Sequence, residues 1–214
     1  MNERFSSRLH RQIKTKIPCL LVLLTLTNAK VAFSQQYERI GIYNTQTAMP
    51  FGKFAGLFTG PVHPGIEYGR GFILSSKEKH DWFLEVKAGY FFHRFVQHGI
   101  PLYANAGYRY KISSRFFAET SVGAGGMQSI PATGKYKLDE NGEYENDKGI
   151  GRVQAIATYG IGGSYLFTPS AKKSMQVFFM YQQKVQLPFI RTYVPLLPYN
   201  SFMIGITRNI SKTK

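Results

Sequence analysis

Apolar side chains alternate with small or polar ones along seven stretches of this chain. The clearest stretch, "WFLEVKAGYFFHR" from Trp82 to Arg94, places Leu84 and Val86 on one face and Glu85 and Lys87 on the other. A repeat of two residues is the side-chain period of a β-strand. The stretches exceed the about 5 or 6 residues of an ordinary strand, and about 9 to 11 tilted residues suffice to cross a bilayer. The pattern therefore predicts membrane-crossing strands.

The number of strands predicts a closed barrel. The seven segments are Pro61 to Phe72, Trp82 to Arg94, Leu102 to Lys111, Phe116 to Gln128, Gly151 to Phe167, Met175 to Leu187 and Asn200 to Ile210. Bacterial single-chain membrane barrels contain an even number of antiparallel strands. An eighth strand is therefore expected, and "YERIGIYN", Tyr37 to Asn44, is the candidate although its alternation is weak.

The connections between the segments predict the topology. Short ones, "SSKEKHD", "ISS" and "TPSAKK", alternate with ones that are longer or rich in proline and aromatic residues, "FVQHGIP", residues 129–150 and "PFIRTYVPLLPY". Outer-membrane barrels have short periplasmic turns and longer extracellular loops. We therefore expect an all-β fold, an eight-stranded antiparallel transmembrane β-barrel with both termini in the periplasm.

The two faces of these strands differ as a membrane barrel requires. Apolar residues such as Ile66, Val122 and Ile204 share the outward parity, whereas glycines and polar residues such as Asn105 and Gln182 share the inward one. A soluble lipid-binding barrel of the lipocalin type would have its apolar face inside. The pattern therefore favours a barrel whose exterior faces lipid.

The first 34 residues have the organisation of a secretory signal peptide. A basic start precedes the apolar run "IPCLLVLLTLT", and Ala32 and Ser34 stand at the small-residue positions of a cleavage site. We expect removal of residues 1–34 and a single domain, residues 35–214, in the outer membrane of a Gram-negative bacterium. The only cysteine, Cys19, lies in the expected signal, so we expect no thiol chemistry in the mature chain.

The chain is strongly basic, with 27 Lys or Arg residues, 12 Asp or Glu residues and a net charge of +15. Residues 1–34 hold six of these bases and one acid, which leaves 21 basic and 11 acidic residues. Export excludes nucleic acid as the partner, and anionic lipid head groups or lipopolysaccharide phosphates match the charge instead. The simpler interpretation is that the charges are scattered over turns and barrel ends. For insertion we expect the barrel-assembly machinery as a partner.

Hairpin geometry predicts pairs among the inward charges. A loop centred near residue 97 sets Glu85 opposite Arg109, and a turn centred at Ser114 sets Arg109 opposite Glu119. With Lys87 beside them, acids and bases would form a ladder that compensates each buried charge. We expect this ladder to be structural, a plug inside a small barrel; the alternative is a gated ion or proton path.

Histidines form the other candidate site. A turn centred near residue 78 sets His63 opposite His93 at the extracellular rim, with His98 in the adjoining loop and Glu67 four residues along the first strand. Such a group could bind zinc or copper, or one histidine could act as general base with Ser129 as nucleophile. The favoured interpretation is ordinary rim histidines, with no metal and no cofactor.

The connection at residues 129–150 contains "KLDENGEYENDK", in which five acids crowd together. It lacks the EF-hand order of acids around a turn glycine, so a solvated loop is favoured over a calcium site. Without an apolar period, this segment is expected to be a mobile extracellular loop.

Three phrases, "PFGKFAGLFTGPVHPGIEYG", "HRFVQHGIPLYANAGYRYK" and "RTYVPLLPYNSFMIG", resemble small, uncharacterised outer-membrane β-barrel proteins of the Bacteroidota type. This resemblance covers most of the mature chain and implies the fold and the location only. The chain is also similar in size to the eight-stranded lipid A deacylases, whose characteristic His-x-Ser signature is absent here.

These observations leave three functional hypotheses. The first is a non-enzymatic, plugged barrel with a surface-binding or membrane-structural role, whose surface ligand is unknown. The second is an outer-leaflet lipid-modifying hydrolase, and the third is a narrow channel for small solutes. An eight-strand interior is just wide enough to be filled by side chains, which disfavours a large pore.

Overall fold

The computed structural model describes residues 35–210, apart from short gaps at 50–51, 53–54, 135, 140–141, 147–148, 169–173 and 190–194. The expected signal peptide, residues 1–34, lies outside the described residues. No helix among the described residues is long and apolar enough to span a membrane.

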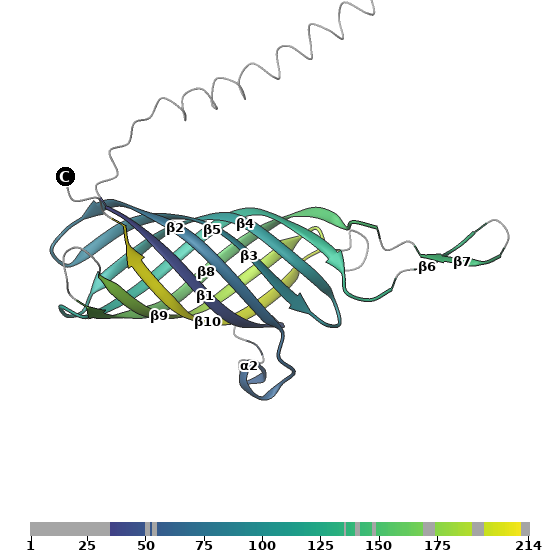
Figure 1. Ribbon diagram of the computed structural model, residues 1–214, viewed down its shortest axis with the longest axis horizontal. Helices are drawn as coiled ribbons and strands as arrows, with labels where there is room; N and C mark the ends of the chain where they lie inside the picture. The colour runs from purple at the N-terminus through teal and green to yellow at the C-terminus, as the bar shows by residue number, and fades with distance from the viewer. Residues whose placement is uncertain are drawn as a thin grey trace, which may run out of the picture. The chain divides into compact units, whose positions relative to one another are not determined.

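Eight long antiparallel strands form a closed barrel (Figure 1). The strands are β1 (Gln35–Thr47), β2 (Pro64–Ser76), β3 (His80–His93), β4 (Gln97–Lys111), β5 (Phe116–Pro131), β8 (Arg152–Thr168), β9 (Met175–Leu187) and β10 (Leu197–Asn209). Each strand pairs with its neighbour in sequence, and β1 closes the barrel against β10. The predicted eight-stranded barrel is confirmed, including its weakly patterned first strand.

Two small elements lie in the connections. A one-turn helix, α2 (Gly56–Thr59), follows β1, and the strands β6 (Tyr136–Leu138) and β7 (Tyr144–Asn146) pair only with each other. The connection expected at residues 129–150 therefore begins later than predicted and contains a hairpin. Strand β5 continues to Pro131, and a short hairpin occupies part of what remains.

The two ends of the barrel differ in their connections. At one end, which we call the turn end, residues 77–79, 112–115 and 169–174 join consecutive strands. At the other, the loop end, residues 48–63, 132–151 and 188–196 form longer connections. One connection at the loop end is short: residues 94–96 form a tight hairpin in which His93 is paired with Gln97. Most of the expected loop "FVQHGIP" therefore belongs to β4. Pro101, which suggested a loop, lies inside β4 opposite Met127 and leaves the side-chain alternation intact.

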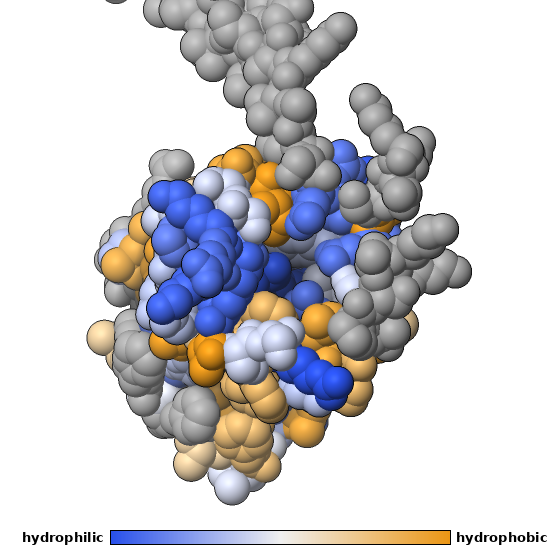
Figure 2. Space-filling view, turned by 90° about the vertical axis from the view of Figure 1, so that its left-hand side faces the viewer, coloured by the Kyte–Doolittle hydropathy of each residue, from blue (hydrophilic) through white to orange (hydrophobic). Residues whose placement is uncertain are grey.

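The barrel is apolar outside and polar inside, as predicted. Large outward side chains are exposed, among them Ile42 at 62%, Leu102 at 60% and Val122 at 58%. The end view in Figure 2 shows hydrophilic residues gathered in the middle of the turn end and hydrophobic residues on its flanks. This is the polarity of a transmembrane barrel and the reverse of a soluble lipid-binding barrel.

Aromatic side chains inside the barrel lie over glycines of the adjacent strand. In the clearest case the Phe83 ring on β3 occupies the space where a Cβ on Gly107, its partner on β4, would stand. The same arrangement joins Tyr37 to Gly71, Tyr43 to Gly65 and Phe91 to Gly99. Glycine therefore makes room for interior rings, which fill the lumen between the strands.

We predict that Gly107→Val destabilises the barrel by about 1–3 kcal/mol, because the added side chain overpacks against the Phe83 ring. Urea unfolding in detergent micelles measures the loss. The matched control is Ala106→Val, which adds a similar volume to the neighbouring, exposed position and should leave the midpoint nearly unchanged. Equal unfolding midpoints for Gly107→Val and the wild type would contradict the ring–glycine packing.

Candidate functional site

Seven buried charged side chains cross the interior as one alternating series of bases and acids. In order of contact, this ion chain consists of Lys184, Glu67, Lys87, Glu85, Arg39, Glu119 and Arg109. Its members come from β9, β2, β3, β1, β5 and β4, so six of the eight strands contribute. None of the seven residues is more than 6% exposed.

The first half of the ion chain is centred on Lys87. Its Nζ lies 3.2 Å from Glu67 Oε1 and 3.3 Å from Glu85 Oε2. Lys184 Nζ lies 3.6 Å from the other oxygen of Glu67. The Tyr103 hydroxyl also donates to that oxygen and itself accepts a 3.0 Å hydrogen bond from Gln182. The Glu67 carboxylate thus has two cations and one hydroxyl as partners.

The second half is centred on Arg39. Its Nη1 lies 3.3 Å from Glu85 Oε1, and its Nη2 lies 2.8 Å from Glu119 Oε2. Arg109 Nε donates to the second Glu119 oxygen at 2.9 Å, and the Ser164 hydroxyl donates there at 3.0 Å. Arg39 therefore joins two carboxylates that would otherwise face each other in a medium of low dielectric constant.

Aromatic rings cover the cations where no carboxylate does. The Arg39 guanidinium lies 4.5 Å from the centroid of Phe178, and Lys184 Nζ lies 4.4 Å from that of Tyr43. Both are cation–π distances, and such contacts strengthen when water is excluded. The series holds four cations and three carboxylates, so these rings also help to accommodate the unmatched positive charge.

Of the two predicted pairings in the ladder, Arg109 with Glu119 is found and Arg109 with Glu85 is not. Arg109 lies beside Glu119, but its partner on β3 is Asp81, and Glu85 lies opposite Asn105. The hairpin after β3 is centred near residue 95 and not 97, because residues 97–101 belong to β4. Arg39 was not predicted as a member of the ladder, although strict alternation from Tyr37 to Tyr43 would have placed it on the inward face.

The four candidate rim residues do not form one site. The rings of His63 and His93 stack with centroids 3.7 Å apart and planes 8° apart, and both residues are buried. His98 lies on the outward parity of β4, where its Nδ1 is 2.8 Å from the Tyr90 hydroxyl, and Glu67 belongs to the ion chain. The predicted grouping of three histidines with a carboxylate is therefore not formed. His98 has the outward parity of its strand, which puts it on the opposite face of the sheet from His63 and His93.

The described residues contain no group of three or more His, Cys, Asp or Glu side chains placed to hold a metal ion. The Ser129 hydroxyl donates to Gln97 and not to a histidine. Burial lowers the pKa of the His63 imidazole.

A second polar cluster, the glutamine cluster, lies near the loop end and was not predicted. Gln97 Nε2 donates to Gln186 Oε1 at 2.6 Å and to the Tyr199 hydroxyl at 2.7 Å, and that hydroxyl donates to Gln186 at 2.9 Å. Ser129 and Gln154 complete the cluster. These five side chains come from β4, β5, β8, β9 and β10, so the cluster bridges the lumen.

No protein-family model and no curated protein matches the chain. Among solved structures, the chain is similar to Neisserial surface protein A, NspA, with 9% identity, a TM-score of 0.49, and 83% of this chain and 97% of that one covered. It is also similar to the N-terminal β-barrel domain of Pseudomonas aeruginosa OprF, with 14% identity, a TM-score of 0.42, and 82% and 97% covered. A third structure, the outer membrane protein AlkL in lipid bilayers, shows 8% identity, a TM-score of 0.39, and 85% and 92% covered.

We predict that Arg39→Met destabilises the barrel by about 3–5 kcal/mol, because Glu85 and Glu119 lose the cation between them. Urea unfolding in micelles measures the change. Adding Glu85→Gln to this variant should recover part of the loss, since it removes one of the two facing charges. The control is Arg115→Met at an exposed turn, which should unfold like the wild type. An unaltered midpoint for Arg39→Met would show that the ion chain does not hold the strands together.

Proposed function

We propose that this protein is an integral outer-membrane β-barrel with a sealed interior, and that it acts as a non-enzymatic surface protein through the connections at its loop end. The observation that carries the proposal is the ion chain, because seven mutually paired side chains cross the lumen where a channel would have to run. A closed barrel of eight strands leaves little interior space beyond that occupied by its own side chains.

The outward surface supports the membrane location. Isoleucine, leucine, valine and aromatic side chains are exposed around the barrel, which would be costly in water and is the normal lining against lipid tails. Residues 1–34 would direct export and be removed, and the barrel-assembly machinery would insert the strands. Lipopolysaccharide would then surround the outer half of the barrel.

The two polar clusters support a sealed interior. The glutamine cluster bridges the strands near the loop end, and the ion chain crosses the lumen farther toward the turn end. A permeating ion would have to displace buried hydrogen bonds or ion pairs in both, each at a cost of several kcal/mol.

The asymmetry of the connections supports a surface role. In the described part of the connection at residues 132–151, Tyr136 is 65% exposed and Tyr144 is 77% exposed on the β6–β7 hairpin. Tyrosine is enriched in protein-binding surfaces because one rigid side chain offers both apolar area and a hydroxyl. Long loops on a rigid scaffold are also where binding residues are usually found. We therefore assign the binding role to the loop end.

Planar-bilayer recording tests the sealed interior. We expect the refolded wild-type barrel to insert without measurable conductance, because the ion chain and the glutamine cluster occupy the lumen. Insertion is established independently by heat-modifiable migration in gels, and an open porin recorded in the same bilayer controls for the measurement. A steady conductance from heat-modifiable protein would favour the narrow channel over the present proposal.

Surface labelling tests the orientation. An epitope tag inserted after Gly142, in the β6–β7 hairpin, should be detected on intact cells, because the loop end is expected outside. The matched control is the same tag after Ser114, at the turn end, which should react only after the outer membrane is broken. The reverse pattern would invert the proposed topology.

A further inference from the structure

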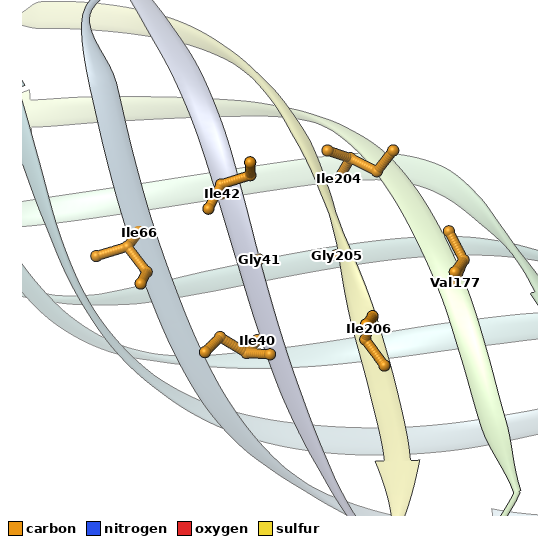
Figure 3. A pocket seen from close by; sticks show the side chains of 8 residues that line it. All are labelled: Ile40, Gly41, Ile42, Ile66, Val177, Ile204, Gly205 and Ile206. Carbon is orange, nitrogen blue, oxygen red and sulfur yellow. The ribbon is translucent and has the colours of Figure 1, made fainter.

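The outer wall of the barrel has an apolar groove at the seam where β1 and β10 pair. Five isoleucines and Val177 surround Gly41 and Gly205, as Figure 3 shows, and we call this feature the isoleucine groove. Ile40 is paired with Ile206 and Ile42 with Ile204, on either side of the glycine pair. Gly41 and Gly205 have the inward parity, and a Cβ on either would point into the lumen toward Phe178, so the floor between the outward isoleucines is backbone.

A charged row borders this groove on the side of the turn end. Arg70, Glu38 and Arg208 are successive partners across β2, β1 and β10, two residues along each strand from the Tyr68–Ile40–Ile206 row. Both arginines are exposed outward. Two guanidinium groups flank one carboxylate, so the row carries an excess positive charge.

The arginines of the row remain available to a ligand. Glu38 Oε1 accepts a 3.0 Å hydrogen bond from the Tyr68 hydroxyl, and Arg70 Nη2 donates at 2.8 Å to Gln36. The other Arg70 donors have no acceptor within the part of the chain that the structure describes. Among the described residues, no hydrogen bond or ion pair holds the Arg208 guanidinium. An arginine next to an apolar groove is suited to a phosphate group that carries hydrocarbon chains.

We propose that the isoleucine groove and its two arginines form a binding site for one anionic glycerophospholipid of the inner leaflet. One acyl chain lies over the glycine floor between the isoleucines, and the phosphate lies between Arg70 and Arg208. This inference rests on the membrane location proposed above. Four residue steps separate Arg208 from Ile204, about 13 Å along the strand. For a strand tilted by about 40° this is about 10 Å of depth, which lies within the about 15 Å of one leaflet's hydrocarbon.

A second copy of the chain fits this surface less well. In a twofold contact the same patch faces itself, so a dimer through the groove would bring the arginines of both copies together at one depth. Like charges at the edge of a membrane interface oppose such a contact, whereas a lipid phosphate neutralises them. The concave, glycine-floored shape also matches a single chain of methylenes better than a second row of outward isoleucines.

Quenching of tryptophan fluorescence by brominated lipids tests the proposal. Trp82 is the only tryptophan of the chain, so the Trp82→Phe variant has no tryptophan fluorescence of its own. In this background, Phe179→Trp reports on the groove, because Phe179 is the exposed partner of Ile204 on β9. Val122→Trp, on β5 across the barrel, is the control reporter. Both are reconstituted in vesicles of phosphatidylcholine with brominated phosphatidylglycerol or brominated phosphatidylcholine at equal mole fraction.

We expect the Phe179→Trp reporter to prefer brominated phosphatidylglycerol by about fivefold or more, since each arginine near the surface attracts an anionic lipid by about that factor. The Val122→Trp reporter should show no preference. Arg70→Gln with Arg208→Gln should abolish the preference at the groove, and the exposed Arg115→Gln should leave it intact. Ile206→Phe, which fills the groove and keeps both arginines, should also lower it.

Other results would overturn the inference in distinguishable ways. Equal quenching of the two reporters by both lipids would show an ordinary lipid-facing wall without a specific site. Protection of the Phe179→Trp reporter from both lipids, increasing with protein density, would show that a second copy covers the groove. Absence of quenching at both reporters, together with loss of heat-modifiability, would instead overturn the membrane location on which the inference rests.

Discussion

The structure depends on the electrostatic neutralisation of seven charges inside a narrow barrel. Closing eight strands brings these side chains into a space that excludes most water, where an unpaired carboxylate costs several kcal/mol. Arg39 neutralises two of the carboxylates at once, since its two terminal nitrogens contact Glu85 and Glu119 from different strands. Because six strands contribute to the ion chain, its charged side chains all find their partners only when the whole barrel has closed in one register.

Packing around the ion chain follows from the same narrow lumen. Interior rings such as Phe83 lie over glycines of the adjacent strand, which gives them room without pushing the strands apart. Phe178 and Tyr43 cover cations of the series, and the glutamine cluster fills the region near the loop end. The interior is therefore packed like a polar core, which is the physical basis of the proposal that the protein acts through its outer surface.

On the exterior, the type of side chain depends on its depth in the membrane. Isoleucines dominate the middle of the β1–β10 seam, while Arg70, Glu38 and Arg208 follow toward the turn end. Aromatic residues such as Trp82 and Tyr108, whose rings are 5.1 Å apart, lie near the same end of their strands. Such a sequence of apolar, aromatic and charged rows is what a boundary between hydrocarbon and head groups selects.

The fold class follows from the side-chain pattern alone, because a period of two over long segments assigns each residue to the lipid or to the lumen without knowledge of the partner strands. Glu85, Lys87, Arg109 and Glu119 could therefore be placed inside, and the alternation from Tyr37 to Tyr43 contained enough information to place Arg39 there as well. Register is a different matter. Moving the centre of the hairpin after β3 by two residues shifts the pairing by four residues. This preserves every inward and outward assignment, yet it replaces Glu85 by Asp81 as the partner of Arg109.

Which charges contact one another depends on the packing of the closed barrel. Contacts such as Arg39 with Glu119 or Lys184 with Glu67 join strands far apart in sequence, and they depend on barrel closure and on how far each long side chain reaches across the lumen. The same holds for the isoleucine groove, which forms because β1 and β10, at opposite ends of the described chain, pair Ile40 with Ile206 and Ile42 with Ile204. Alternation along one strand specifies a face, whereas a site requires the register among several strands.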